Sequence, residues 1–122
     1  MGNLAKRIDS ITFYKIQTMK WLYLFTAIVL EVVGTVAIKN SNGFTNLKPT
    51  ILLIIAYSLS FFFLSLALKF WKVGVAYATW SGLGNTLIVL VSIYYFKENI
   101  SMMKIVSILL IVLGVISLNL SK

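Results

Sequence analysis

The chain has 122 residues, of which 60% are hydrophobic and 11% are charged. A soluble globular domain contains roughly 45–50% apolar and about 25% charged residues, so this composition excludes an ordinary soluble domain. Because the sequence has no Cys and no His, it also excludes disulfides, thiol nucleophiles and most zinc sites. No base–nucleophile pair or ligand set is visible, and we therefore expect neither an enzyme nor a metal or other cofactor.

Four long apolar runs are separated by short polar segments. They cover about residues 21–38, 49–68, 74–96 and 105–120. Each run is close to the ~20 apolar residues that a membrane-spanning helix needs, and none alternates as a transmembrane β-strand does. The only proline, Pro49, suits the first turn of the second run. The sequence therefore predicts an all-α membrane protein in which residues 19–122 form four transmembrane helices joined by short loops.

Residues 1–18 differ from the rest of the chain because they are polar, basic and too weakly apolar to span a membrane. We expect a basic N-terminal tail that is disordered, or a natural start of the chain at Met19. The alternative is an amphipathic helix on the membrane surface, since Leu4, Ile8 and Ile11 recur at helical spacing.

The basic residues form no cluster beyond Lys6-Arg7, which argues against a nucleic-acid partner. Most lie near the ends of the apolar runs, where positive charge governs orientation in the membrane. From Met19 onward the two sides are equally charged, with Lys20, Lys69, Lys72 and Lys122 on one and Lys39, Lys48, Lys97 and Lys104 on the other. An equal division gives no preferred orientation and predicts a dimer of two antiparallel copies. Residues 1–18 add further positive charge to the first side, which leaves a heterodimer with a homologous subunit as an alternative.

Glu31 is the one ionisable acid or base well inside a predicted span. It lies ten residues after Trp21, or about 15 Å along a helix, which is near the midplane of a hydrocarbon layer about 30 Å thick. A carboxylate at that depth costs several kcal/mol, so a functional role is the default hypothesis. Burial disfavours the empty, ionised carboxylate, and a proton and a cation would compete for it. Such competition is the minimal machinery of an antiporter.

Four residues share the helical face of Glu31, and the small ones among them leave space beside the carboxylate. They are Leu24, Ala27, Gly34 and Thr35. In the third run, Tyr77, Trp80 and Ser81 share one arc, and Tyr57 of the second run supplies a further wall. Aromatic ring faces beside a carboxylate suit a large, flat or quaternary cation.

Small residues in the last two runs suggest a bend in the third helix and a dimer contact on the fourth. Gly82 and Gly84 weaken the third helix where a bend would help alternating access. Ser107, Gly114 and Ser117 offer small-residue contact points for a dimer on the fourth helix.

Residues 19–122 resemble the small multidrug resistance transporters over nearly their whole length. The matching motifs are Glu31-Val32-Val33-Gly34-Thr35, Lys39, Asn42-Gly43-Phe44-Thr45, Pro49, Ala76-Tyr77-Ala78-Thr79-Trp80-Ser81-Gly82-Leu83-Gly84, Phe96-Lys97-Glu98 and Gly114-Val115. The resemblance implies an antiparallel dimer in the bacterial inner membrane that exchanges protons for hydrophobic cationic drugs. It also implies that Glu31 binds both proton and substrate, and that Tyr57, Tyr77 and Trp80 line the pocket.

The resemblance is closer to the quaternary-ammonium and multidrug branch of that family. The guanidinium-exporting branch usually carries Trp where this chain has Gly34. Asn85 stands at a position that is commonly apolar, and Ser107 at one that is often glycine. The expected partners are protons, hydrophobic cations, membrane lipid and a second subunit. The alternatives are a subunit of a heterodimeric exporter of polyamines or drugs, and a small dual-topology ion channel.

Overall fold

The computed structural model describes residues 2–121. Its helices are α1 (Gly2–Asn40), α2 (Leu47–Ala67), α3 (Val73–Tyr94) and α4 (Met102–Leu120). All four are long and apolar enough to cross a membrane, and the described residues contain no strand. The prediction of an all-α membrane protein with four transmembrane helices is therefore confirmed. Lys122, one of the residues in the charge count, lies outside the described residues.

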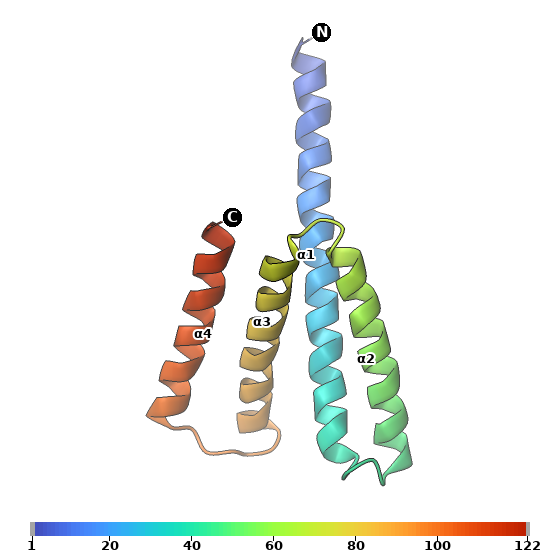
Figure 1. The fold of residues 1–122 in the computed structure, drawn as a ribbon, viewed down its shortest axis with the longest axis vertical. Helices are drawn as coiled ribbons and strands as arrows, with labels where there is room; N and C mark the ends of the chain where they lie inside the picture. Colours follow the sequence, from blue (N-terminus) through green and yellow to red (C-terminus); the bar gives the residue numbers. More distant parts are fainter. Residues whose placement is uncertain (1, 122) are drawn as a thin grey trace.

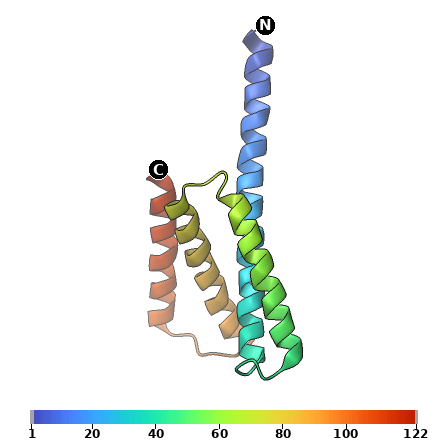
Figure 2. The ribbon, with the colours of Figure 1, turned by 45° about the vertical axis from the view of Figure 1, so that its right-hand side comes forward.

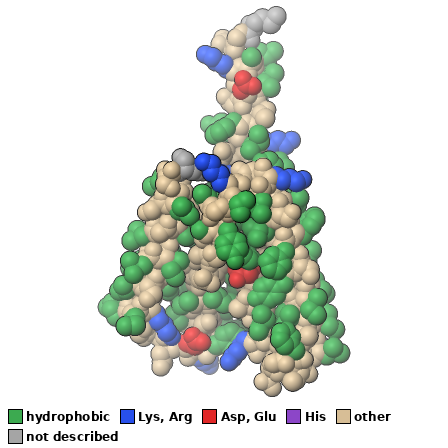
Figure 3. Space-filling view, in the orientation of Figure 1, with side chains coloured by type: hydrophobic (Ala, Val, Ile, Leu, Met, Phe, Trp, Pro, Cys, Tyr) green, Lys and Arg blue, Asp and Glu red, His purple; other side chains and the backbone are tan. Residues whose placement is uncertain are grey.

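The helices run alternately in opposite directions and lie side by side in the order α4, α3, α1, α2 (Figures 1 and 2). Thus α1 packs against both α2 and α3, and α4 packs against α3 at the edge. The connections 41–46 and 95–101 lie at one end of the bundle, and the connection 68–72 lies at the other with the C-terminal end of α4. Lys and Arg side chains gather at the two ends and along the projecting helix (Figure 3).

Residues 2–18 form the first part of α1 and continue directly into its membrane-spanning part. At 39 residues and 1.5 Å per residue, α1 is about 58 Å long, nearly twice the thickness of the hydrocarbon layer. Its first turns therefore project beyond the bundle (Figure 1). The structure thus differs from the expected disordered tail, and it shows no change of direction that would lay these residues flat on a membrane surface.

A pair of tryptophan rings joins α1 to the α2–α3 connection at the end from which α1 projects. The Trp21 and Trp71 rings meet edge to face with their centroids 4.7 Å apart. The Lys20 ammonium lies 4.0 Å from the centre of a Trp71 ring, and the Trp71 indole N–H donates to the Lys20 carbonyl at 3.2 Å. Trp and Tyr favour the membrane–water boundary, so this tryptophan pair marks where α1 enters the membrane.

The contact between α3 and α4 depends on a glycine and an asparagine. A Cβ atom on Gly82 would lie 2.5 Å from Cγ2 of Val115 in α4, so only glycine fits there without a shift. The Asn119 amide donates to the Thr79 hydroxyl at 3.0 Å. Gly82 allows close packing of α3 against α4, and the bend of α3 expected at this residue stays a prediction.

The remaining surface of α4 is open. None of its residues is buried, and a Cβ atom on Gly114 would meet nothing within 4 Å. The three residues expected to form a dimer contact, Ser107, Gly114 and Ser117, are all exposed on this helix. A dimer contact through them stays a prediction.

Candidate functional site

Glu31 lies in the part of α1 that packs inside the bundle, where it faces α3. One carboxylate oxygen, Oε2, is buried and has no hydrogen-bond partner among the described residues. A buried polar atom without a partner is costly, and it is especially costly inside a membrane, where no bulk water can satisfy it. The carboxylate is therefore the natural starting point for a site.

Gly84 is the residue of α3 that lets the carboxylate fit. Oε2 of Glu31 occupies the place where a Cβ atom on Gly84 would be, and Cδ of Glu31 lies 3.2 Å from that place. Any side chain at position 84 would displace the carboxylate. In the structure this glycine allows the close approach of Glu31 and α3, and the helix bend expected at Gly84 stays a prediction.

The turn of α1 that follows Glu31 is hydrogen-bonded to α2 through hydroxyl groups. The Thr35 hydroxyl donates to the Glu31 carbonyl at 2.9 Å and lies 2.7 Å from the Tyr57 hydroxyl. Because the single proton of Thr35 is used on the carbonyl, the Tyr57 hydroxyl is the donor in the second bond. Gly34 makes room for the Tyr57 ring, whose nearest atoms lie 3.0 Å from the place of a Cβ atom.

Four aromatic side chains from α2 and α3 form one cluster, which we call the aromatic cluster: Tyr57, Phe61, Tyr77 and Trp80. The ring centroids of Tyr57 and Phe61 are 6.4 Å apart, those of Phe61 and Trp80 5.9 Å, and those of Tyr77 and Trp80 5.4 Å. Trp80 is buried, and its indole N–H has no hydrogen-bond partner among the described residues. Tyr77 is exposed.

Sequence reasoning missed Phe61. Its spacing of four residues from Tyr57 places both rings on one face of α2, and that signal was available. It was overlooked because α2 is apolar all round, so that one more phenylalanine does not stand out.

Other predicted site residues lie in different surroundings. Leu24 and Ala27 are fully buried in the hydrophobic core, where the Ala27 carbonyl accepts a 2.6 Å hydrogen bond from Ser60 of α2. Ser81 is half-buried, and its hydroxyl makes a long 3.4 Å bond to the Ala78 carbonyl. A role for these three residues in a substrate pocket stays a prediction. The described residues contain no group of three or more His, Cys, Asp or Glu side chains that could hold a metal ion.

A bundle of four spanning helices with a buried carboxylate oxygen between α1 and α3 defines the class of this molecule, a small polytopic membrane protein with a polar site inside its bundle. A family model described as Small Multidrug Resistance protein matches residues 19–111. The chain belongs to the small multidrug resistance family. It is therefore a multi-pass bacterial membrane protein and a multidrug efflux transporter, and it is not an enzyme.

Several curated proteins are similar to the chain over most of its length. The uncharacterized membrane protein YvaE of Bacillus subtilis is 54% identical over 102 residues, which cover 84% of this chain and 86% of that protein. The quaternary ammonium compound-resistance protein QacE of Escherichia coli is 48% identical over 82% of this chain and 91% of its own length. The corresponding protein QacG of a Staphylococcus strain is 46% identical over 83% and 94%.

The fit of the carboxylate against Gly84 can be tested with Gly84→Ala. The added methyl group takes the place of Glu31 Oε2, so we expect the carboxylate to turn out of the α1–α3 contact and to react faster with a carbodiimide. Gly74→Ala is the matched control, since a Cβ atom there would meet nothing within 4 Å. Equal rates of Glu31 modification in both variants and the wild type would contradict the assignment.

Proposed function

We propose that the protein is a proton-coupled antiporter that exports hydrophobic or quaternary-ammonium cations, with Glu31 binding the proton and the cation in competition. The observation that carries this proposal is the buried Glu31 Oε2, which has no partner among the described residues. The names of the similar quaternary ammonium compound-resistance proteins support the substrate class.

The physical argument begins with the cost of an isolated carboxylate inside a membrane. A charged side chain there costs several kcal/mol unless its charge is neutralised. A bound proton neutralises it, and so does a bound organic cation. Because both occupy the same carboxylate, entry of one favours departure of the other. Exchange across the membrane follows if the carboxylate faces the two sides in turn.

The aromatic cluster supports recognition of the cation. Ring faces attract a positive charge, and the attraction grows when water is excluded. Tyr57 of α2 belongs to this cluster and is hydrogen-bonded to Thr35 of α1, and Thr35 lies one helical turn after Glu31. A hydrophobic cation at Glu31 would thus have aromatic surface within reach, and inorganic cations would gain less from it.

We further propose that two oppositely oriented chains form the transport unit. This extension rests on the equal division of basic residues from Met19 onward and on the open surface of α4. The added charge of residues 2–18 favours one orientation. A heterodimer with a homologous subunit is therefore the alternative when the whole chain is present.

Glu31→Gln is expected to abolish proton-coupled export, because the amide cannot exchange a proton or neutralise a cation. The purified wild-type protein should release protons when a quaternary ammonium compound is added, and the variant should release none. Unchanged export by the variant at normal expression would overturn the proposed mechanism. Cation flux in the wild type that does not depend on a proton gradient would favour an ion channel instead.

Trp80→Ala is expected to weaken binding of a quaternary aromatic cation by about 1–2 kcal/mol, the scale of a desolvated cation–π contact. Trp80→Phe should lose less, because a smaller ring face remains. Phe62→Ala is a suitable control, since Phe62 is exposed on α2 and lies outside the aromatic cluster. Calorimetry that gives one affinity for all of these proteins would reduce Trp80 to a packing residue.

The orientation of the chains can be read from a single cysteine, because the natural sequence contains none. Asn99 is exposed in the 95–101 connection, whereas Ser41 at the same end is fully buried, so Asn99→Cys is the better choice. A chain that begins at Met19 should be labelled from both sides of the membrane, and residues 1–18 should shift the ratio to one side. Labelling from one side only, in a chain that transports alone, would rule out the antiparallel homodimer.

A further inference from the structure

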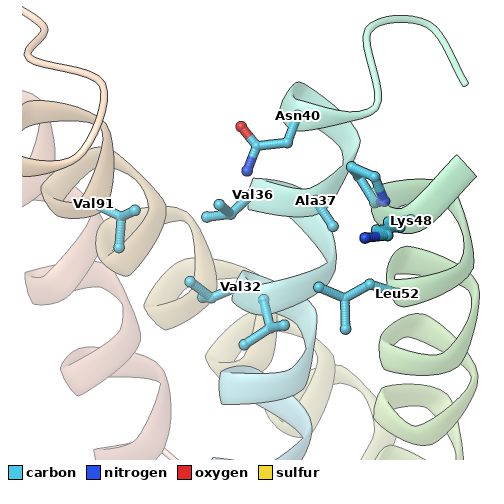
Figure 4. A pocket seen from close by; sticks show the side chains of 9 residues that line it. Val32, Val36, Ala37, Asn40, Lys48, Leu52 and Val91 are labelled. Carbon is cyan, nitrogen blue, oxygen red and sulfur yellow. The ribbon is translucent and has the colours of Figure 1, made fainter. Parts of the chain in front are cut away.

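An open groove lies between α1 and α2 at the end of the bundle that carries the 41–46 connection. Its volume is about 510 Å³, and most of its lining is aliphatic. Val32, Val36 and Leu52 line the deeper part, Val91 of α3 lies across from them, and Asn40 and Lys48 lie at the mouth (Figure 4). The groove does not include Glu31 or any member of the aromatic cluster.

We propose that this groove binds one anionic phospholipid, with an acyl chain against the aliphatic walls and the phosphate near Lys48 and Asn40. The depth of the groove in the membrane fits this occupant. The apolar lining belongs to spanning parts of α1, α2 and α3, and the polar mouth lies where the helices end at the membrane surface. A basic pocket between spanning helices is a typical binding place for an anionic headgroup.

Charge complementarity favours an anion at the mouth. The basic residues at this end are Lys39, Lys48, Lys97 and Lys104, and the sole acid beside them is Glu98, which pairs with Lys104 at 3.9 Å. The N-terminus of α2 adds partial positive charge, because Asn46 makes no side-chain cap there and donates its amide to the Asn40 carbonyl instead.

The same charges disfavour the other possible occupants. A cationic drug would be repelled by Lys48 at the mouth of the groove. A second copy of the chain seated in the groove would bring another lysine-bearing end to Lys48 in either orientation, since Lys69 and Lys72 lie at the opposite end of the bundle. The dimer proposed above uses the open surface of α4 instead. The lipid proposal does not rest on proton coupling and concerns a place apart from the candidate transport site.

The headgroup is tested with the purified full-length protein in detergent micelles that contain equal amounts of dioleoyl phosphatidylglycerol and dioleoyl phosphatidylcholine. Native mass spectrometry counts the lipids that remain bound. The wild type should retain more phosphatidylglycerol, and Lys48→Gln should lower the ratio about fivefold, the effect of one lysine near an anionic lipid. Lys39→Gln removes the same charge at the same end outside the groove, and it should keep the wild-type ratio.

The acyl-chain site is tested with a matched pair of tryptophan variants on α2. Leu52 lines the groove and is 48% exposed, whereas its neighbour Ile51 is 47% exposed and does not line it. Leu52→Trp should fill the groove and lower the number of retained phosphatidylglycerol molecules, and Ile51→Trp should not. Because both positions lie on the surface of the bundle, neither variant disturbs the core.

Four results would overturn the proposal. The wild type could retain both lipids equally, or Lys39→Gln and Lys48→Gln could lower the ratio equally, which would indicate diffuse charge at this end. Leu52→Trp could weaken self-association and leave lipid retention unchanged, which would make the groove a contact between copies of the chain. A quaternary ammonium compound could displace the retained lipid equally from the wild type and Lys48→Gln, which would make the groove a substrate path.

Discussion

Inside a membrane, every polar group must find its partner within the protein, because no bulk water is available to replace it. The interior of this bundle obeys that constraint at Ser60, whose hydroxyl donates to the Ala27 carbonyl, and at Thr35, which satisfies the Glu31 carbonyl. The side-chain exceptions among the described residues are Oε2 of Glu31, the Trp80 indole N–H and Oδ1 of Asn119. Two of these three groups belong to the candidate site.

The carboxylate of Glu31 thus organises the helices around it. Its present contact with α3 depends on the absence of a Cβ atom at position 84, and the Tyr57 ring lies only 3.0 Å from the place where a Cβ atom on Gly34 would be. Both glycines allow helices to approach closely, as small residues commonly do in membrane bundles. In this chain α3 approaches the Glu31 carboxylate, and the Tyr57 ring of α2 packs against Gly34 one turn further along α1.

Charge and aromatic residues act differently at the ends of the bundle and at its centre. At the end from which α1 projects, the Lys20 ammonium already lies over the Trp71 ring. In the centre, no cation–π contact joins a lysine or arginine of the described residues to the aromatic cluster. The acidic Glu31 lies in the neighbouring helix. The same pairing of cation and ring that stabilises the end of the bundle is therefore proposed to bind a ligand in its centre.

The sequence by itself determined the four spans and the family of the protein, and it predicted the depth of Glu31. These properties follow from local features, since the length of an apolar run sets a span and the helical rise sets a depth. Helical periodicity also predicted that Tyr77 and Trp80 share a face, and their ring centroids lie 5.4 Å apart.

The tertiary structure alone decided which faces of different helices meet. Periodicity gives each helix its faces but not its rotation against a neighbour, which depends on how all the side chains pack. The sequence therefore did not predict that Val115 packs against Gly82 and that the Glu31 carboxylate packs against Gly84. For the same reason, the sequence showed Lys48 only as one charge at the end of a span. The packing of α1 and α2 places this lysine at the mouth of an aliphatic groove.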